Sequence, residues 1–540
     1  MLTPSYLLHA VEPAEEIAEQ LHQDILNRII ERVLHRFKRG DDYILTATDK
    51  WNIELLQEAG YLLEDIQKDI ADATRYMQSE IAEAMEDAGV RALEYDDKIY
   101  RQAGLDPVPL VQSTKLIGIM QRDYEATMGE WVNFTRTTAT ATQQAFIRAC
   151  DKAYHQAMTG AISMAQAVKE ALEEVVNAGV YVRYPSGHTD TIETATTRAV
   201  RTGISQASAD IQNARMDEFD IDLVLVSSHM GARPEHAEWQ GKIYSRSGTS
   251  DKYPDFVSST GYGSVTGLCG ANCRHNFGPY FEGMDNPFDD YDSEENLRAY
   301  ELQQRQRALE RRIRDTKRKT MNWKTAMDAE TDPVQKSIFE AEYQRKAALL
   351  QKQNAAYKQF CVENDFKTRA DRVSIAKWDR EQAAQARAAA KKKPQISAKK
   401  PKDYSVFSTL NITKADSIRP KSIINNLKKS EIGQRTIDYL EKEGVPVNLC
   451  YGIDNPEGYS GTYDPFDDVI NVYCDITKTT METAKTVIHE ATHRQMGSTH
   501  TFAEELECFK AEVIHEKGVL TKEDLESIIK HIQKHYPDLR

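Results

Sequence analysis

The strongest constraint on the fold is a helical repeat of apolar residues in the first part of the chain. Over residues 13–38 apolar side chains recur about every four positions, as on one face of a helix. They are Ile17, Leu21, Ile25, Ile29, Val33 and Phe37. Similar spacing continues to Met85 and, after a break at 103–107, returns over 109–177 and 189–216. The pattern predicts a scaffold of long helices over residues 1–215, and we find no catalytic constellation in it.

The rest of the chain divides by composition. A strand-like run at 221–228 opens a module, residues 216–288, that is rich in glycine, proline, histidine and aromatic residues. Residues 289–385 predict a charged helical arm, 386–402 an Ala/Lys/Pro linker, and 403–540 a compact α+β region. The expected fold is multidomain and mostly α. It comprises a long-helix N-terminal scaffold, a small α+β Cys/His-containing module, the arm and a C-terminal α+β domain.

Charge and hydropathy exclude some classes of partner. The net charge of −15 argues against a general nucleic-acid binder, although the basic stretch 305–319 keeps DNA as a weak expectation. A solvated helix is the alternative for that stretch. Because no apolar run approaches the ~18–20 residues that span a bilayer, and no secretory signal is visible, we expect no membrane partner. Seven cysteines do not form an obvious disulfide framework, which favours a reducing compartment.

The C-terminal region contains His489-Glu490-x-x-His493. On a helix the two imidazoles lie one turn apart on one face, where they can bind one metal ion. Glu490 stands beside the first ligand and can act as a general base toward a water molecule at the metal. Thr479, with Glu482 three residues later, predicts a helix start near 480. Two alternatives remain: a helix with ordinary polar groups, and an inactive site that keeps the shape.

A catalytic zinc site requires a third protein ligand. The sequence predicts Glu505, in the pattern Glu505-x-x-Cys508, with Glu504 and Glu507 as competitors. His500 also stays open, although the longer motif with glycine and histidine three and six residues past His493 is not satisfied. Methionine and threonine stand at those two positions. The Glu-x-x-small pattern resembles that of HExxH-plus-Glu zincin peptidases, in which an edge strand aligns the substrate. This resemblance implies Zn²⁺ as cofactor, a peptide substrate and a metallopeptidase activity.

A second group of metal-ligand residue types lies in the 216–288 module. They are Cys269, Cys273 and His275, with His229 and His236 upstream. Their spacing is not that of a common zinc finger. A structural metal is therefore one interpretation, and packing of these side chains in a small core is the other.

Several runs in this module carry a family resemblance. They are Ser228–His236, Gly241–Ser245, Tyr253–Phe256, Gly261–Gly263 and Gly267–His275. Together they resemble the phage minor capsid protein 2 family, which is related to the Mu F-like head morphogenesis proteins, and the likeness covers roughly residues 1–290. It implies a tailed-phage head protein whose partners are portal and capsid proteins. Its expected location is the virion interior at the portal vertex, with a host-cytoplasmic stage during assembly or after ejection.

The function predicted from these patterns combines both parts of the chain. We expect a portal-associated minor capsid protein whose C-terminal zinc metallopeptidase domain hydrolyses peptide bonds of head or host proteins. One alternative is a polymorphic toxin delivered by a phage-derived N-terminal part. Another is a purely structural capsid protein with an inactive zincin domain.

Overall fold

The computed structural model describes residues 1–37, 48–159, 162–178, 180–184, 187–392, 406–410, 420–451, 458–498, 501–536 and 539. Most of the predicted linker and the candidate His500 lie outside these residues. The described chain forms two compact units. Unit 1 comprises Met1–Met158, Ala171–Thr325 and Phe360–Asp379, and unit 2 comprises Thr159–Glu170, Ala326–Gln359 and Arg380–Arg540. The chain is mostly helical, as predicted, and its described strands form three small sheets.

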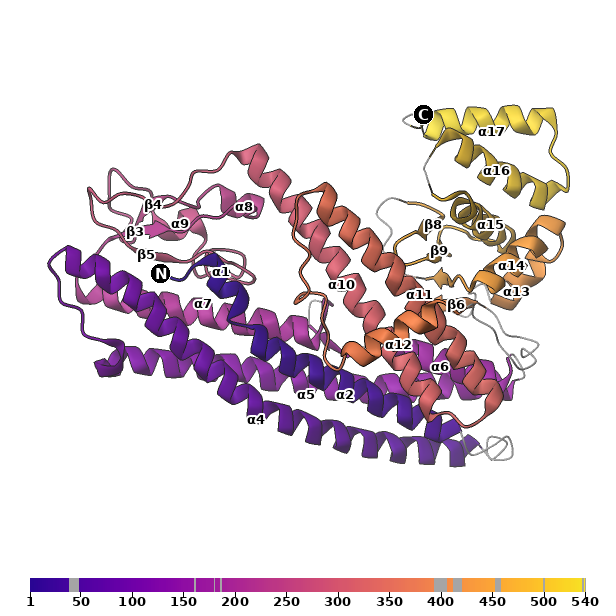
Figure 1. Cartoon of the computed structure of the whole chain (residues 1–540), viewed down its shortest axis with the longest axis horizontal. Helices are drawn as coiled ribbons and strands as arrows, with labels where there is room; N and C mark the ends of the chain where they lie inside the picture. The colour runs from indigo at the N-terminus through magenta and orange to yellow at the C-terminus, as the bar shows by residue number, and fades with distance from the viewer. Residues whose placement is uncertain are drawn as a thin grey trace. The chain divides into compact units, whose positions relative to one another are not determined.

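Unit 1 is built on long helices that pack along one another (Figure 1). They are α2 (Glu12–Phe37), α4 (Thr48–Gln102), α5 (Thr114–Met158) and α7 (Ile192–Glu218), preceded by the short α1 (Pro4–His9). Of the predicted stripe on α2, Leu21, Ile25, Ile29 and Val33 are at most 2% exposed. The apolar repeat therefore marks the face that is buried between the helices.

Two predicted helical tracts begin or end differently in the structure. The tract expected over 109–177 consists of the 3₁₀ turn η1 (Leu110–Gln112), α5 and a separate helix α6 (Met164–Ala178). The Ser163 hydroxyl accepts the backbone N–H of Gln166 and so starts a new helix there. The tract expected from 189 begins with strand β2 (Thr189–Thr191), which pairs with β1 (Tyr181–Arg183). Thr191 then caps α7 by accepting the N–H of Thr194.

A small sheet adjoins this helical framework within unit 1. Its central strand β3 (Leu223–Val226) pairs antiparallel with β4 (Ile243–Ser245) and with β5 (Phe277–Pro279). The short helices α8 (Pro234–Ala237) and α9 (Phe256–Thr260) lie in the connections. Its core is aromatic, and Trp239, Tyr244, Phe256 and Phe277 are buried in it.

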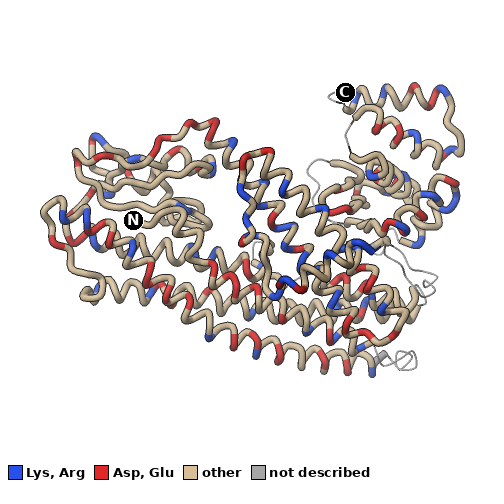
Figure 2. The backbone as a smooth tube through the Cα atoms, in the orientation of Figure 1, with Lys and Arg blue, Asp and Glu red and all other residues tan. Residues whose placement is uncertain are grey.

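The charged segment continues as three helices, α10 (Ser293–Ala329), α11 (Pro333–Glu363) and α12 (Arg380–Ala390). Figure 2 shows acidic and basic residues interspersed along them. Within unit 1, Arg314 and Arg318 of α10 form ion pairs with Glu15 and Glu19 of α2, each at 3.0 Å. Ile313, which precedes Arg314, is fully buried. This part of α10 is therefore packed through both its apolar and its charged side chains.

Unit 2 contains a four-stranded sheet in the order β6-β7-β9-β8. Strands β6 (Phe407–Leu410), β7 (Val447–Cys450) and β9 (Val469–Tyr473) are parallel, and β8 (Gly461–Asp464) is the antiparallel edge strand. The sequence predicts a Gly/Asp/Pro loop over residues 452–466, and this prediction is wrong because the stretch contains β8. The strand that directly precedes the motif helix, β9, is a central strand of the sheet.

The helices of unit 2 follow the sequence more closely. The helix expected over 420–443 is divided into α13 (Pro420–Leu427) and α14 (Glu431–Glu443) because Ser430 caps a new helix. Helix α15 (Thr480–Met496) starts with the predicted capping box of Thr479 and Glu482. Helices α16 (Phe502–Lys517) and α17 (Lys522–His535) follow. The side of α15 that the sequence predicts to be buried consists of Ala484, Val487, Ile488 and Ala491. These residues are at most 1% exposed and belong to the core that includes residues of β7 and β9.

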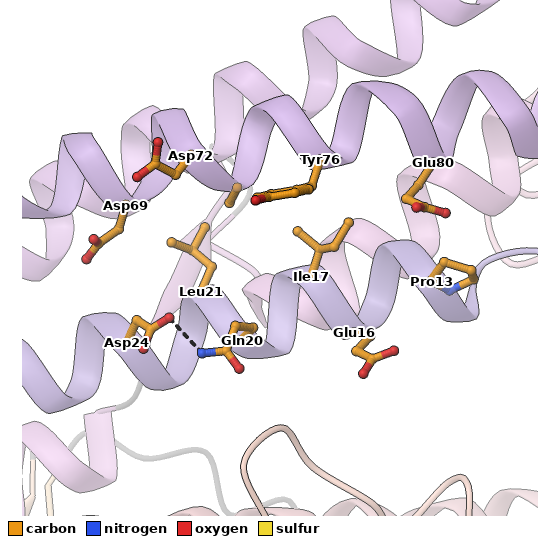
Figure 3. Close-up of a pocket in the computed structure, with 11 residues that line it drawn as sticks. Pro13, Glu16, Ile17, Gln20, Leu21, Asp24, Asp69, Asp72, Tyr76 and Glu80 are labelled. Atoms are coloured by element: carbon orange, nitrogen blue, oxygen red, sulfur yellow. Dashed lines mark hydrogen bonds between the residues drawn. The ribbon is translucent and has the colours of Figure 1, made fainter.

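A groove runs along α2 and α4 in unit 1 and has a volume of about 470 Å³ (Figure 3). Carboxylates dominate its polar lining, and some of them already have partners. Asp24 accepts from Gln20 at 2.8 Å, and Asp69 accepts from Arg28 at 2.7 Å. Among the described residues, no helix is both long enough and apolar enough to span a bilayer.

Candidate metal centres

The first centre lies in unit 2, where α15 and α16 pack against each other. The Nε2 atoms of His489 and His493 are 3.1 Å apart, as expected for imidazoles one helical turn apart. The Glu505 carboxylate of α16 faces both nitrogens. One of its oxygens is 3.5 Å from His489 Nε2 and the other is 3.3 Å from His493 Nε2. The structure thus brings together the three residues that the sequence predicted as metal ligands.

The opposite nitrogen of each imidazole is held by a second carboxylate. His489 Nδ1 lies 2.7 Å from Glu512, and His493 Nδ1 lies 2.8 Å from Glu504. Because an ionised carboxylate only accepts hydrogen bonds, each Nδ1 carries the proton when the imidazole is neutral. Both Nε2 atoms then present lone pairs toward each other and toward Glu505. Histidine ligands of protein-bound metals are commonly oriented in this way.

Glu490 lies beside this group and is 7% exposed. Burial raises the pKa of its carboxyl above the ordinary value, and the positive charges of His489 and His493 oppose the rise. The backbone N–H of Tyr463, on β8, also interacts with this carboxylate. A buried carboxylate with a raised pKa, between the helix and the edge strand, has the properties of a general base.

The charge of the centre fits a divalent cation. Burial acts to raise the pKa of Glu505, but the facing imidazoles of His489 and His493 outweigh burial and lower the pKa to about 2. Burial likewise acts to lower the pKa of His489, yet Glu505 and Glu512 outweigh it and raise that pKa to about 10. One oxygen of Glu505 is buried and has no hydrogen-bond partner among the described residues. Two imidazoles and one carboxylate are ligand types that zinc accepts in proteins.

The competing third ligands are placed differently. Glu504 holds the Nδ1 side of His493 and is fully buried, so it orients a ligand from behind. Glu507 is half exposed and pairs with Lys510 at 2.7 Å. The sequence interpretation did not anticipate Cys508 as a donor, but its sulfur lies within 4.8 Å of the donor atoms of both histidines. It also missed Glu512, although Glu512 follows Glu505 by two helical turns and therefore shares its face of α16.

The second centre lies in unit 1. Of the five residues proposed from the sequence, the structure brings together His236, Cys273 and His275, which are at most 2% exposed. His229 stacks on the His275 ring at 4.4 Å, but its Nδ1 lies 3.2 Å from the Met230 carbonyl oxygen. The sulfur of Cys269 is 3.8 Å from the His275 carbonyl oxygen, and burial raises the pKa of the Cys269 thiol.

Comparisons with known proteins connect this architecture with phage particles. The family model described as phage minor capsid protein 2 matches residues 2–361. A structural protein of Lactococcus phage LL-H is 23% identical over 367 residues, which cover 65% of this chain and 95% of that protein. A structural protein of Lactococcus phage mv4 is 34% identical over 127 residues, which cover 23% of this chain and 94% of that protein. No solved structure matches.

The protein combines a long-helix scaffold with a small Cys/His module, and its relatives are phage structural proteins. It is therefore a structural protein of a phage virion. The chain belongs to the phage minor capsid protein 2 family. As a component of the virion it associates with other phage capsid components. The family match ends at residue 361, so the centre formed by α15 and α16 lies beyond the matched segment.

Proposed function

We propose that this minor capsid protein is associated with the portal of a tailed phage and that unit 2 is a zinc-dependent peptidase. One observation carries the peptidase proposal. The lone-pair nitrogens of His489 and His493 and the carboxylate of Glu505 converge within 3.5 Å of one another. Glu490 lies buried beside them.

In this mechanism each residue has a separate task. His489, His493 and Glu505 would hold the metal, while Glu504 and Glu512 fix the two imidazole rings. Zinc, when bound, supplies Lewis-acid polarisation of the scissile carbonyl and lowers the pKa of water. Glu490 accepts a proton from the attacking water on its carboxylate and then transfers it to the nitrogen of the leaving amine. Its raised pKa favours this second transfer.

Strand β8 is suited to bind the substrate backbone. The N–H of Tyr473 donates to the carbonyl of Ser460 at 2.9 Å, which fixes the alternation of the β8–β9 ladder. The backbone groups of Gly461 and Tyr463 are therefore turned away from β9 and toward the free edge. An extended peptide can add to this edge as a further strand. We propose that the peptide belongs to head proteins during assembly, or to host proteins after ejection.

The test combines metal analysis with peptide cleavage by the full-length chain. Wild type should bind zinc and cleave a fluorogenic peptide library. Glu490→Gln should bind zinc equally but lose at least ~10²-fold in rate, as expected for loss of a general base. Glu507→Gln on α16 is the matched control, because Glu507 is half exposed and lies outside the centre. Equal cleavage by wild type and Glu490→Gln would contradict the proposed mechanism.

A second control addresses the ligands. His493→Ala should remove both the zinc of unit 2 and the activity, whereas Glu507→Gln should retain both. Zinc content that is unchanged by His493→Ala would exclude this centre as a metal site. The toxin alternative has no observation in its favour, since both relatives described above are named as structural proteins.

A further inference from the structure

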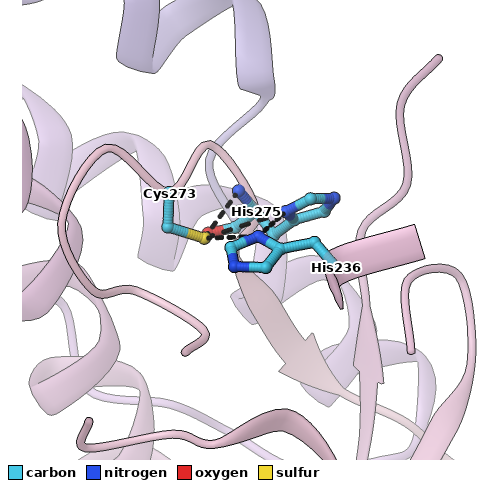
Figure 4. Close-up of side chains that lie close together, drawn as sticks. All are labelled: His236, Cys273 and His275. Atoms are coloured by element: carbon cyan, nitrogen blue, oxygen red, sulfur yellow. Dashed lines mark hydrogen bonds between the residues drawn. The ribbon is translucent and has the colours of Figure 1, made fainter. Parts of the chain in front are cut away.

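The Cys/His cluster of unit 1 has a geometry that simple packing does not require. His236 comes from α8, and Cys273 and His275 come from the loop that leads into β5. Their donor atoms form a triangle (Figure 4). The two Nδ1 atoms are 3.3 Å apart, and the Cys273 sulfur is 3.8 Å from His236 Nδ1 and 3.7 Å from His275 Nδ1.

Hydrogen bonds on the far side of each ring fix the tautomers. His236 Nε2 lies 2.9 Å from the Thr266 carbonyl oxygen, so this nitrogen carries the proton. His275 Nε2 lies 3.0 Å from the side-chain oxygen of Gln240. That oxygen also accepts the backbone N–H of His229 at 3.0 Å, which settles the orientation of the Gln240 amide. Both Nδ1 atoms therefore direct lone pairs into the triangle.

One thiol proton cannot satisfy this arrangement. The S–H of Cys273 can donate a hydrogen bond to only one of the two imidazoles. The Nδ1 lone pair of the other imidazole is then buried without a donor, and it faces the lone pair of the first imidazole. A further proton would add a buried positive charge in the neighbourhood of Arg233 and Arg274. An ion with bonds to all three atoms instead satisfies both Nδ1 lone pairs and the sulfur at once, and the Cys273 thiolate offsets one of its two positive charges.

The edge lengths of the triangle agree with coordination. Zinc–nitrogen bonds of about 2.0–2.1 Å and a zinc–sulfur bond of about 2.3 Å define the site. At tetrahedral angles they place two nitrogens about 3.3 Å apart and a nitrogen and a sulfur about 3.6 Å apart. A hydrogen-bonded nitrogen pair would favour a shorter separation than the observed 3.3 Å.

We propose that His236, Cys273 and His275 bind a zinc ion through Nδ1, Sγ and Nδ1. The ion links α8 to the loop before β5 and so stabilises the module, with a water molecule as the fourth ligand. A cavity of about 850 Å³ within unit 1 provides the path of entry, since both histidines line it together with Arg274 and Arg307. Thr266 and Gln240 are the outer hydrogen-bond partners that orient the rings.

The experiment uses the full-length chain with the His493→Ala substitution, so that unit 2 does not contribute metal or a Cys508 signal. Purified from zinc-supplemented cultures, this chain should hold a single zinc. Exchanged with cobalt, it should show a sulfur-to-cobalt charge-transfer band. Adding Cys273→Ser should abolish the band and the zinc, whereas Cys269→Ser should keep both, because that thiol lies outside the triangle.

A second variant tests the orientation of the rings without removing a ligand. Gln240→Ala should weaken zinc binding by about 10–100-fold, as loss of an outer-shell partner does elsewhere. A His493→Ala chain without zinc and without a cobalt–sulfur band would overturn the proposal even if the cysteine variants fail to fold. A band that persists in Cys273→Ser would overturn it as well. Neither result depends on peptidase activity, so this site and the proposed function can fail independently.

Discussion

Replacing Gly461 by alanine tests how closely β8 must approach α15. A Cβ atom at this position would lie 2.4 Å from Thr486 Cγ2 and 3.2 Å from Glu490 Cγ. Carbon atoms pack best at about 3.5–4.0 Å, so the strand must move away from the helix by roughly 1 Å. Overpacking of this kind costs about 1–3 kcal/mol in the free energy of unfolding. We expect Gly461→Ala to destabilise unit 2 by that amount.

A partner substitution identifies the cause. Thr486→Ser removes only Cγ2 and retains the hydroxyl that donates to the Glu482 carbonyl at 3.0 Å. Combined with Gly461→Ala, it should restore about half of the lost stability, because contacts with Asn471 and Glu490 remain. The resulting coupling energy should fall in the range of about 0.5–3 kcal/mol that is typical of residues in contact.

The assay exploits the distribution of tryptophan. All five tryptophans of the chain, Trp51, Trp131, Trp239, Trp323 and Trp378, lie in unit 1. Thermal unfolding followed by tryptophan emission therefore serves as an internal control, while far-UV circular dichroism also reports unit 2. Gly461→Ala should shift the second signal and not the first, and the displaced Glu490 should lower peptide cleavage by ~10²-fold. An unchanged dichroism transition, or no recovery with Thr486→Ser, would refute the reasoning.

Two further predictions concern charged pairs, one in each unit. Arg494 contacts both oxygens of Asp468, at 2.6 and 3.0 Å. Burial acts to raise the pKa of Asp468, but the effect of Arg494 is larger and lowers the pKa from 3.8 to about 2. The stabilisation, about 2 kcal/mol, is thus present above pH ~4 and lost as pH falls toward ~2. Circular dichroism should show Asp468→Asn less stable than wild type at pH 7, with a difference that shrinks toward acid pH; a constant difference would contradict this. In unit 1, Arg318→Ala leaves Glu19 and the 2% exposed Glu193 side chain without their shared cation. Unfolding monitored by tryptophan emission should therefore show that the free energy of unfolding falls by about 3–5 kcal/mol. A decrease below about 1 kcal/mol would contradict this prediction.

Local signals accounted for much of the fold. The apolar stripe of α2 and the capping box at Thr479 each depend on residues within one or two turns, and both predictions are confirmed. Strand β8 was missed because Gly461–Asp464 has no alternation of apolar and polar residues. Its strand conformation is stabilised by pairing with β9 rather than by the β-propensity of its own residues. Strand β6 was missed for a similar reason, since it joins the sheet by parallel pairing with β7, a partner that is distant in sequence.

The candidate sites divide in the same way. The spacing of His489 and His493 is a local property of one helix, so the sequence could predict that they meet. The prediction of Glu505 as the third ligand depended on a second helix and on a resemblance. In the structure its carboxylate lies opposite both imidazoles. The tautomer-setting partners Thr266 and Gln240 could not be predicted, because each reaches its histidine from 30 or more residues away in the chain.

The basic stretch on α10 shows that sequence alone overestimates how many positive side chains are free to bind a partner. A run of arginines and lysines predicts either a solvated face or a polyanion-binding surface, because neither the partner nor the burial is visible in it. In unit 1 the Arg314 and Arg318 side chains meet glutamates of α2 and α7, and they are at most 18% exposed. Binding DNA through them would require breaking pairs that include the buried Glu193, at a cost that surface phosphate contacts do not offset. The net charge of −15 and these internal pairs therefore both argue against DNA binding through Arg314 and Arg318.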